Sequence, residues 1–400
     1  MKSRILWWIT GMTLFTLLAT PVRIVAQGEQ PQAVHFQHYT VTDLGTLGGT
    51  YSYGYGINNV GVVSGGAATP TQTGGVSQTA FLWHGGHMIN LGTLGGRNCP
   101  ACNSEAGGPN ASSESPLVSE TSTTDPNGED FCGFGTHLQC LGAIWKNGVM
   151  TALPNLPGGH NGQAYWVNNQ GQVVGLAEND IADSTCSVPF QAFRYEAVMW
   201  RPNGKIQELR PLPGDTVGFA FGINNKGLSV GSSGLCSNVS LPPNSPPNGP
   251  HAVLWNEDGS PTDLGNLEGA PFNIATSIND LGEVVGNSQF TDGTVQAFLW
   301  TKATGKPQGL GTLPGDFLSV APCCNTINNR GQVVGFSIPG PQGSGRAFIW
   351  QNGVMADLNT LIPAGSPWYL LAACSINDAG QIAGQGLING NVHAFLLTPR

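Results

Sequence analysis

A repeated unit constrains the fold of this 400-residue chain more than any other feature. Its clearest copy is residues 263–308, DLGNLEGAPFNIATSINDLGEVVGNSQFTDGTVQAFLWTKATGKPQ. The unit holds four apolar segments in a fixed order: a leucine segment (D-L-G-x-L), a small-residue segment ending in I-N-D, a V-V-G segment, and A-F-L-W. Self-similarity at this period is typical of repeat architectures, in which each unit buries its apolar side chains against its neighbours.

Turn residues separate the segments. N-[ND]-x-G tetrads follow Ile57, Ile223, Ile278, Ile327 and Ile376, and Asn-Gly or Asp-Gly pairs follow several of the tryptophans. Asn and Asp tolerate turn geometry, Gly supplies positive φ, and Asn-Gly and Asp-Gly pairs are typical of tight β-hairpins. Each unit is therefore predicted to be a four-stranded antiparallel meander.

The A-F-L-W strand is apolar on both faces. Phe81 and Trp83 point to one face while Ala80 and Leu82 point to the other, because side chains alternate along a strand. Such a sheet must be covered on both sides, as in the radial blades of a β-propeller. Leucine strands and tryptophan strands each occur seven times, so we predict an all-β, seven-bladed β-propeller over residues 39–400. The Gly- and Ala-rich segments, such as residues 53–56 and 219–222, suit the crowded innermost strands.

The two ends of the repeat region complement each other. Residues 38–47 form a leucine strand with no preceding tryptophan strand, and the last unit ends at Leu397 with no following leucine strand. We therefore expect the N-terminal strand to complete the last blade, which removes two exposed sheet edges. In the second unit, residues 109–118 replace the I-N-N-x-G tetrad, so an irregular inner hairpin is expected there.

Residues 1–26 have the composition of a secretory signal peptide. Lys2 and Arg4 precede an apolar run from Ile5 to Leu18, and cleavage is predicted after Ala26. An uncleaved anchor is the alternative, although the run is short for a bilayer span of about 20 residues. Residues 27–38 are a polar lead-in, and no later stretch could cross a membrane. We expect a secreted protein, extracellular or periplasmic.

The charge of the chain argues against nucleic acid as a partner. Removing the three basic residues of the signal segment leaves twelve basic and twenty-four acidic residues, a net charge of about −12. An acidic chain without basic clusters is a poor binder of nucleic acid or anionic lipid. The expected partner is an extracellular glycan or protein, and the expected state is a monomer.

Nine cysteines in a secreted chain predict disulfides, with one thiol left over. Cys99 and Cys102 resemble half of a zinc site, but Cys132 and Cys140 do not supply a second C-x-x-C. We therefore favour local disulfides among these four residues over zinc.

The remaining cysteines predict bonds between blades. Cys186 and Cys236 lie in equivalent connections of the third and fourth units, so adjacent blades would bring them together. Cys374 is expected to pair with Cys323 or Cys324, which precede an equivalent I-N tetrad. One cysteine of that adjacent pair would remain unpaired.

The combination of D-L-G-T-L-G-G, I-N-N-x-G-x-V-V-G and H-A-F-L-W resembles the HAF family of extracellular repeat proteins of bacteria. Residues 251–255 (HAVLW) and 393–395 (HAF) carry the namesake motif, and the resemblance covers nearly all of residues 39–400. It implies secretion and a repeat β fold, and it supplies no catalytic residues. Thr79, Glu196, Gln296 and Arg346 stand at the namesake histidine position in other units, which favours a strand-edge role.

Length variation falls in the connections after the V-V-G strands and after the leucine strands, which share one face of a propeller. Function on propellers sits on loops held by a rigid scaffold, so this long-loop face is the candidate working surface. Its candidate residues follow leucine strands near the axis: His160, Asp215, Asp316, Phe317 and Trp368. Asp215 and Asp316 share a P-G-D context and are interpreted either as turn caps or as a carboxylate pair at the channel mouth. Trp368 and Tyr369 are interpreted as buried loop residues or as a sugar-stacking platform.

Two functions fit the sequence. The favoured one is a secreted, non-enzymatic binding or surface-interaction module. The alternative is a propeller hydrolase or lyase that acts on a glycan or lactone through a central metal. The chain has no H-E-x-x-H motif and no phosphate-binding loop, and no catalytic residue, metal ligand or cofactor is assigned.

Overall fold

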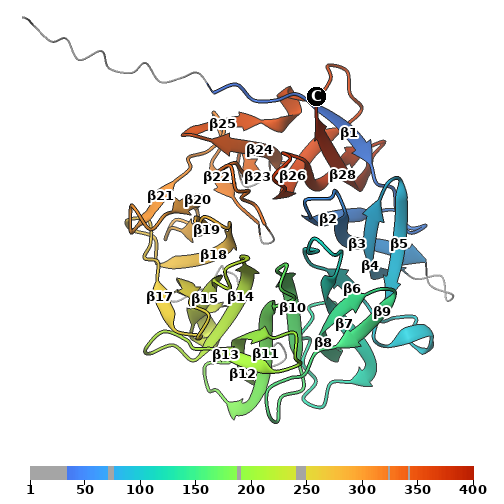
Figure 1. Cartoon of the computed structure of the whole chain (residues 1–400), viewed down its shortest axis with the longest axis vertical. Coiled ribbons are helices and arrows are strands. Elements are labelled where there is room, and N and C mark those ends of the chain that lie inside the picture. Colours follow the sequence, from blue (N-terminus) through green and yellow to red (C-terminus); the bar gives the residue numbers. More distant parts are fainter. Residues whose placement is uncertain (1–33, 71–75, 187–190, 240–248, 323–324, 341–342) are drawn as a thin grey trace, which may run out of the picture. The chain divides into compact units, whose positions relative to one another are not determined.

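The computed structural model describes residues 34–70, 76–186, 191–239, 249–322, 325–340 and 343–400. Residues 36–400 form one compact unit. Within it, seven four-stranded antiparallel sheets lie in a ring around a central axis (Figure 1). Six of the sheets are meanders of four consecutive strands from the inside outward, and in the seventh the first strand of the chain joins the last three. The predicted all-β, seven-bladed β-propeller is therefore confirmed.

The blades follow the chain in order. Blade 1 consists of β2 (Ser52–Ile57), β3 (Val63–Pro70), β4 (Val76–His84) and β5 (His87–Gly92). Blade 2 consists of β6 (Ser104–Ala106), β7 (Ser115–Thr124), β8 (Leu138–Lys146) and β9 (Val149–Ala152). Blade 3 consists of β10 (Gly162–Val167), β11 (Val173–Ala182), β12 (Phe193–Trp200) and β13 (Ile206–Leu209). Blades 4 and 5 consist of β14 (Val217–Ile223), β15 (Ser229–Gly234), β16 (His251–Trp255) and β17 (Pro261–Asp263); and β18 (Phe272–Ile278), β19 (Val284–Gln289), β20 (Val295–Trp300) and β21 (Pro307–Gly309). Blade 6 consists of β22 (Leu318–Val320), β23 (Val333–Ile338), β24 (Arg346–Gln351) and β25 (Val354–Asp357), and blade 7 begins with β26 (Tyr369–Ile376), β27 (Ile382–Ile388) and β28 (Asn391–Pro399). The helical elements of the described residues are η1 (Gly96–Asn98), α1 (Cys236–Val239) and η2 (Leu358–Thr360).

The N-terminal strand completes the last blade, as predicted. β1 (Tyr39–Asp43) pairs antiparallel with β28, from Tyr39 opposite Pro399 to Asp43 opposite Phe395. Tyr39 is buried in the core of blades 6 and 7. The first and last strands of the propeller are thus neighbours in one sheet, and the edge of β28 is covered (Figure 1).

Glycine in the V-V-G strand is required by the backbone of the inner strand beside it and, in four blades, also by the phenylalanine of the A-F-L-W strand. A Cβ at Gly384 would lie 2.7 Å from Cζ of Phe395 and 2.2 Å from the carbonyl oxygen of Ala372. Gly286 has the same relationship to Phe298 in blade 5. The phenylalanine rings are fully buried. In these blades the repeated motif therefore places the phenylalanine ring of the third strand directly over the glycine of the second strand.

The first asparagine of each N-x-x-G turn joins its blade to the next. The side-chain amide of Asn224 donates to the carbonyl of Asn279 (3.0 Å), and that of Asn279 donates to the carbonyl of Asn328 (3.0 Å). Equivalent bonds link every pair of adjacent blades, and the complete set of donors is Asn58, Asn110, Asn168, Asn224, Asn279, Asn328 and Asn377. These seven buried asparagines, here called the asparagine ring, surround the axis on the tight-hairpin face and enclose a cavity of about 100 Å³.

Blade 2 retains this turn, which corrects the expectation of an irregular hairpin. The side-chain oxygen of Asn110 accepts from the backbone N–H groups of Ser112 and Glu114, at 3.0 Å each. Ser113 takes the glycine position with a φ of 61°. The tetrad was not recognised because a serine adopts the backbone conformation that glycine supplies elsewhere. The irregularity lies instead in β6, which has three residues.

The predicted signal peptide and most of the predicted lead-in lie outside the described residues. Among the residues that the structure does describe, no helix is long and apolar enough to cross a membrane.

Candidate functional site

The long connections surround a cavity of about 710 Å³ near the axis. Six of its lining residues come from the connections between second and third strands of blades 2, 3 and 4: Asp130, Phe131, Cys132, Gly133, Gln191 and Cys236. The others belong mainly to inner strands of blades 3 to 6. A cavity of this size falls in the range of about 300–1,000 Å³ that is typical of small-molecule sites.

Aromatic side chains make up one wall. Phe219 and Phe221 lie two residues apart on β14, so both point to the same side, and their rings stack with centroids 5.7 Å apart. The ring of Tyr165 on β10 lies 5.3 Å from Phe221, and that of Tyr195 on β12 lies 4.9 Å from Phe219. Phe131, from the connection between β7 and β8, meets Tyr195 edge-on at 6.3 Å. Five rings from three blades therefore form one continuous surface.

Two disulfides hold the loops of this wall. Cys132 and Cys140 are bonded with their Cα atoms 5.5 Å apart, which anchors the connection that carries Phe131. Cys186 and Cys236 are bonded with Cα atoms 4.8 Å apart, which joins blade 3 to blade 4 as predicted. Cys132 and Cys236 both line the cavity.

A third disulfide joins Cys99 to Cys102, so these residues are not half of a zinc site. The predicted pairing of Cys374 with Cys323 or Cys324 involves residues 323–324, which lie outside the described residues; Cys374 is buried. Three disulfides are typical of a non-cytoplasmic environment.

Buried carboxyl groups lie behind the aromatic wall. The side-chain amide of Asn161 donates to Asp125 (2.8 Å) and to Glu129 (3.0 Å), and Glu178 accepts from the backbone N–H of Asn161 (3.2 Å). Gln191, which lines the cavity, donates to Glu178 Oε1 at 3.1 Å. Burial, followed by the neighbouring charge of Glu129, raises the pKa of Glu178 to about 8. Burial also raises the pKa of Glu129. These groups fix the Phe131 connection onto blade 3.

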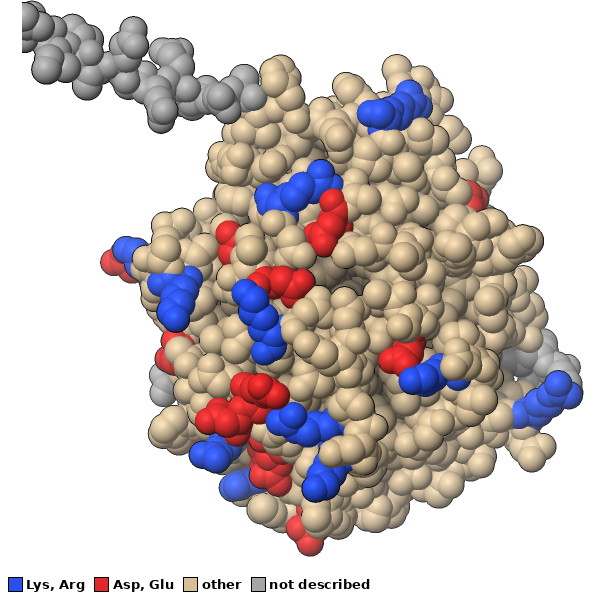
Figure 2. Space-filling view, in the orientation of Figure 1, with Lys and Arg blue, Asp and Glu red and all other residues tan. Residues whose placement is uncertain are grey.

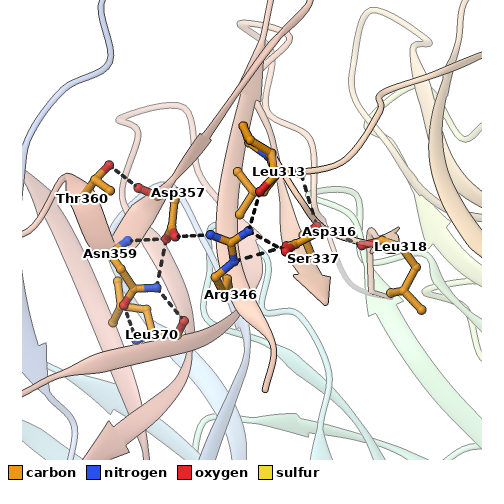
Figure 3. Close-up of polar contacts among 10 residues, drawn as sticks. Leu313, Asp316, Leu318, Ser337, Arg346, Asp357, Asn359, Thr360 and Leu370 are labelled. Carbon is orange, nitrogen blue, oxygen red and sulfur yellow. Dashed lines mark hydrogen bonds and ion pairs between the residues drawn. The ribbon is translucent and has the colours of Figure 1, made fainter. Parts of the chain in front are cut away.

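The structure places Asp215 and Asp316 in separate blades, each with its own basic partner. Asp316 pairs with Arg346 of β24, and Arg346 also contacts Asp357 at 3.4 Å (Figure 3). Asp215 Oδ2 lies 3.0 Å from Nδ1 of His251 on β16 and accepts from the hydroxyl of Ser233.

Arg346 and His251 both occupy the namesake histidine position. The hydrogen bond to Asp215 raises the pKa of His251. At this position His393 likewise contacts Asp43, at 3.0 Å. In these three blades the position thus supplies a cation or imidazole to a carboxylate of the same blade, which favours a structural role.

The other three candidates also lie away from the cavity lining. The backbone N–H of His160 donates to Glu178 at 2.9 Å, so His160 contributes through its main chain. Trp368 is buried in the core of blade 7, where its ring meets Phe395 edge-on. Phe317 is exposed on the surface. None of the five predicted residues is therefore brought together with another at the cavity.

The cavity aromatics were visible in the sequence but were interpreted differently. The Gly and Ala residues of the segment F-A-F-G predict a small-residue strand that suits a crowded axis. Ala220 is indeed buried between blades, but Phe219 and Phe221 alternate with it and face the cavity. The alternation of small and aromatic residues could have predicted this arrangement. Successive side chains of an inner strand point in opposite directions, so the small residues pack between blades and the aromatic residues between them face the cavity.

Charged side chains on the face in view are of both signs. Figure 2 shows basic and acidic side chains beside one another on a mostly uncharged face. Among the described residues, no group of three or more His, Cys, Asp or Glu side chains is placed to hold a metal ion.

No family model and no curated protein matches the chain. Solved structures of similar fold include a puromycin hydrolase (TM-score 0.54, 13% identity, 88% of this chain and 52% of that chain) and a Mycobacterium tuberculosis puromycin-hydrolyzing peptidase (0.52, 13%, 88% and 53%). Oligogalacturonate lyase from Vibrio parahaemolyticus is also similar, with a TM-score of 0.53 and 11% identity. That match covers 91% of this chain and 95% of the lyase. This chain spans about half the length of the two puromycin-cleaving proteins. At these identities the likeness shows the fold alone.

Proposed function

We propose that this protein is a secreted propeller that binds a small molecule with apolar or aromatic surfaces. The ligand would occupy the cavity of about 710 Å³ beside the aromatic wall. One observation carries the proposal: five aromatic rings from three blades converge on a cavity of about 710 Å³. Sites for small molecules are typically concave and lined by apolar and aromatic side chains, with few polar groups that fix orientation.

Most polar side chains of the lining already have partners within the protein. Asn287 bonds both backbone groups of Ala321, at 2.8 and 2.9 Å. Gln163 donates to the carbonyl of Phe131 at 2.6 Å. Ser232 differs, because its buried hydroxyl has no hydrogen-bond partner among the described residues. A lining of this kind favours a ligand held by ring and apolar contacts over one that needs many hydrogen bonds.

The cellular setting supports an extracellular ligand. The disulfides point to a non-cytoplasmic environment. Secretion through residues 1–26 and membership of the HAF family are parts of the same proposal, supported by the apolar N-terminal run and by the repeated motifs.

A second candidate is an enzyme, a hydrolase or lyase whose substrate occupies this cavity. The similar structures favour it over a purely non-enzymatic module, because they include puromycin-cleaving proteins and an oligogalacturonate lyase. Buried carboxyl groups of raised pKa beside a cavity are also typical of active sites. Glu178 is such a group, and it accepts a hydrogen bond from the lining residue Gln191. A central metal is expected for this alternative from the sequence, with no ligands assigned to it. Within the described residues, no group of three or more His, Cys, Asp or Glu side chains is placed to hold one.

A fluorescence titration tests the cavity. The uncharged probe N-phenyl-1-naphthylamine is expected to bind the wild-type protein, and Phe221→Ala is expected to weaken binding about tenfold through loss of ring stacking and apolar contact. Phe317→Ala is the matched control, because Phe317 is an exposed aromatic residue outside the lining. Equal binding by all three proteins would contradict the proposal.

A product assay separates binding from catalysis. The wild-type protein is incubated with oligogalacturonate and with puromycin, and products are followed by mass spectrometry. Turnover that disappears in Phe221→Ala would establish the enzymatic candidate. Probe binding with neither substrate converted would support the binding module.

A further inference from the structure

A second group of aromatic side chains lies on the inner edge of blade 1. Tyr53 and Tyr55 lie on β2, and Tyr51 precedes the strand, so alternation puts all three on one side. Ring centroids are 5.1 Å apart for Tyr51 and Tyr53 and 6.4 Å apart for Tyr53 and Tyr55. All three side chains are half-buried, so this tyrosine ladder offers ring surface to a ligand.

A carboxyl group from the neighbouring blade lies against this ladder. Glu105 is the middle residue of β6, the inner strand of blade 2. It accepts hydrogen bonds from Gln78 Nε2 and from Tyr55. Burial raises the pKa of Tyr51, and the neighbouring Tyr53 and Glu105 raise it further. One carboxyl group therefore contacts Tyr55 at one end of the ladder and acts electrostatically on Tyr51 at the other.

Glu105 has no cationic partner within the described residues. Each ion pair found there involves other acidic residues. Burial raises the pKa of Glu105, because a desolvated carboxylate is costly unless a cation compensates it. The side chain keeps partial exposure, so an external cation can reach it.

We propose that Glu105 and the tyrosine ladder form a binding site for an organic cation such as an alkylammonium group. Tyrosine faces attract cations through their ring quadrupoles, and assemblies of rings are a known way to bind quaternary ammonium ligands. A metal ion fits less well, because hard cations take several oxygen ligands and, within the described part of the chain, no group of three or more His, Cys, Asp or Glu side chains could hold one. The site lies on blades 1 and 2, whereas the cavity is lined by blades 3 to 6 and one connection of blade 2, so it does not rest on the proposed function.

Tetramethylammonium chloride is the probe, and calorimetry with ligand-observed NMR measures its binding to residues 27–400. The wild-type protein is expected to bind the cation, and Glu105→Gln is expected to weaken binding at least tenfold through loss of the charge. Glu268→Gln removes an exposed carboxylate elsewhere and is expected to change nothing beyond a general charge effect. Sodium chloride at the same concentration controls for ionic strength.

The ring contribution has its own pair of variants. Tyr53→Leu keeps apolar bulk but removes the ring, and it is expected to weaken binding about fivefold or more. Tyr53→Phe keeps the ring and is expected to bind like the wild type. This pair keeps the test decisive if Glu105→Gln fails to fold. No binding by the folded wild-type protein, or equal binding by Tyr53→Leu and Tyr53→Phe, would overturn the proposal.

Discussion

The side-chain amide of Asn377 donates a 2.9 Å hydrogen bond to the backbone carbonyl of Asn58, 319 residues earlier in the chain. This contact closes the asparagine ring between the last blade and the first. The side-chain oxygen of each ring asparagine also accepts from its own turn; that of Asn58 accepts from the N–H groups of Val60 and Val62. One residue type thus shapes the hairpin and joins adjacent blades.

Two adjacent asparagines of blade 1 test the ring. Asn58→Ala is expected to lower the free energy of unfolding by about 2–4 kcal/mol, because it leaves buried backbone groups without partners. Asn59→Ala, at an exposed position in the same turn, is expected to cost less than about 1 kcal/mol. Urea unfolding measures both. Similar losses in the two variants would show that the ring adds nothing beyond ordinary turn bonding.

Closure by β1 predicts the effect of a truncation. Removing residues 27–48 deletes β1, exposes the edge of β28 and removes the buried ring of Tyr39. We expect aggregation or a lower, broader melting transition, because an unpaired edge strand can pair with another chain. Light scattering after size exclusion and a melting curve measure this. A truncated protein that stays monomeric with an unchanged curve would refute the role of closure.

The disulfide between Cys186 and Cys236 links two residues that are 50 positions apart in the sequence. Cys186→Ser with Cys236→Ser is expected to lower stability by about 2–4 kcal/mol, mainly by relaxing the unfolded chain. Peptide mapping without reduction should recover the linked pair. Linkage of Cys186 to any cysteine of blade 2 would contradict the register of blades 3 and 4.

The buried carboxyl cluster predicts a pH dependence of stability. The pKa of Glu178 is higher in the folded protein than in the unfolded chain, so between about pH 5 and pH 8 the folded state binds more protons. Stability is therefore expected to fall as pH rises through this window and to level off above it. Glu178→Gln should flatten the slope, and Glu268→Gln, at an exposed site, should not. Urea midpoints measured at several pH values check the prediction.

The repeat made the architecture predictable. The blade number, the closing strand and the Cys186–Cys236 bond all follow from matching positions in successive units, because equivalent residues of adjacent blades lie side by side. The turn of blade 2 was harder to predict, because Ser113 at positive φ leaves no glycine in the motif.

The site was less predictable, because it depends on residues that the repeat does not share. Asp215 and Asp316 stood out as a matched pair, but each is paired with the basic side chain of its own blade. Phe219 and Phe221 were hidden in a strand recognised by its small residues. Which inner-strand side chains face an open cavity depends on the loops above them, and those loops vary from blade to blade.

The most direct test of ligand binding in the central cavity is a crystal structure of the protein with N-phenyl-1-naphthylamine. We expect electron density for the probe between Phe221, Tyr165 and Phe131, with its rings stacked on the β14 aromatics. Probe density only at other surfaces, with the cavity filled by rearranged side chains or by ordered water alone, would contradict the proposed site.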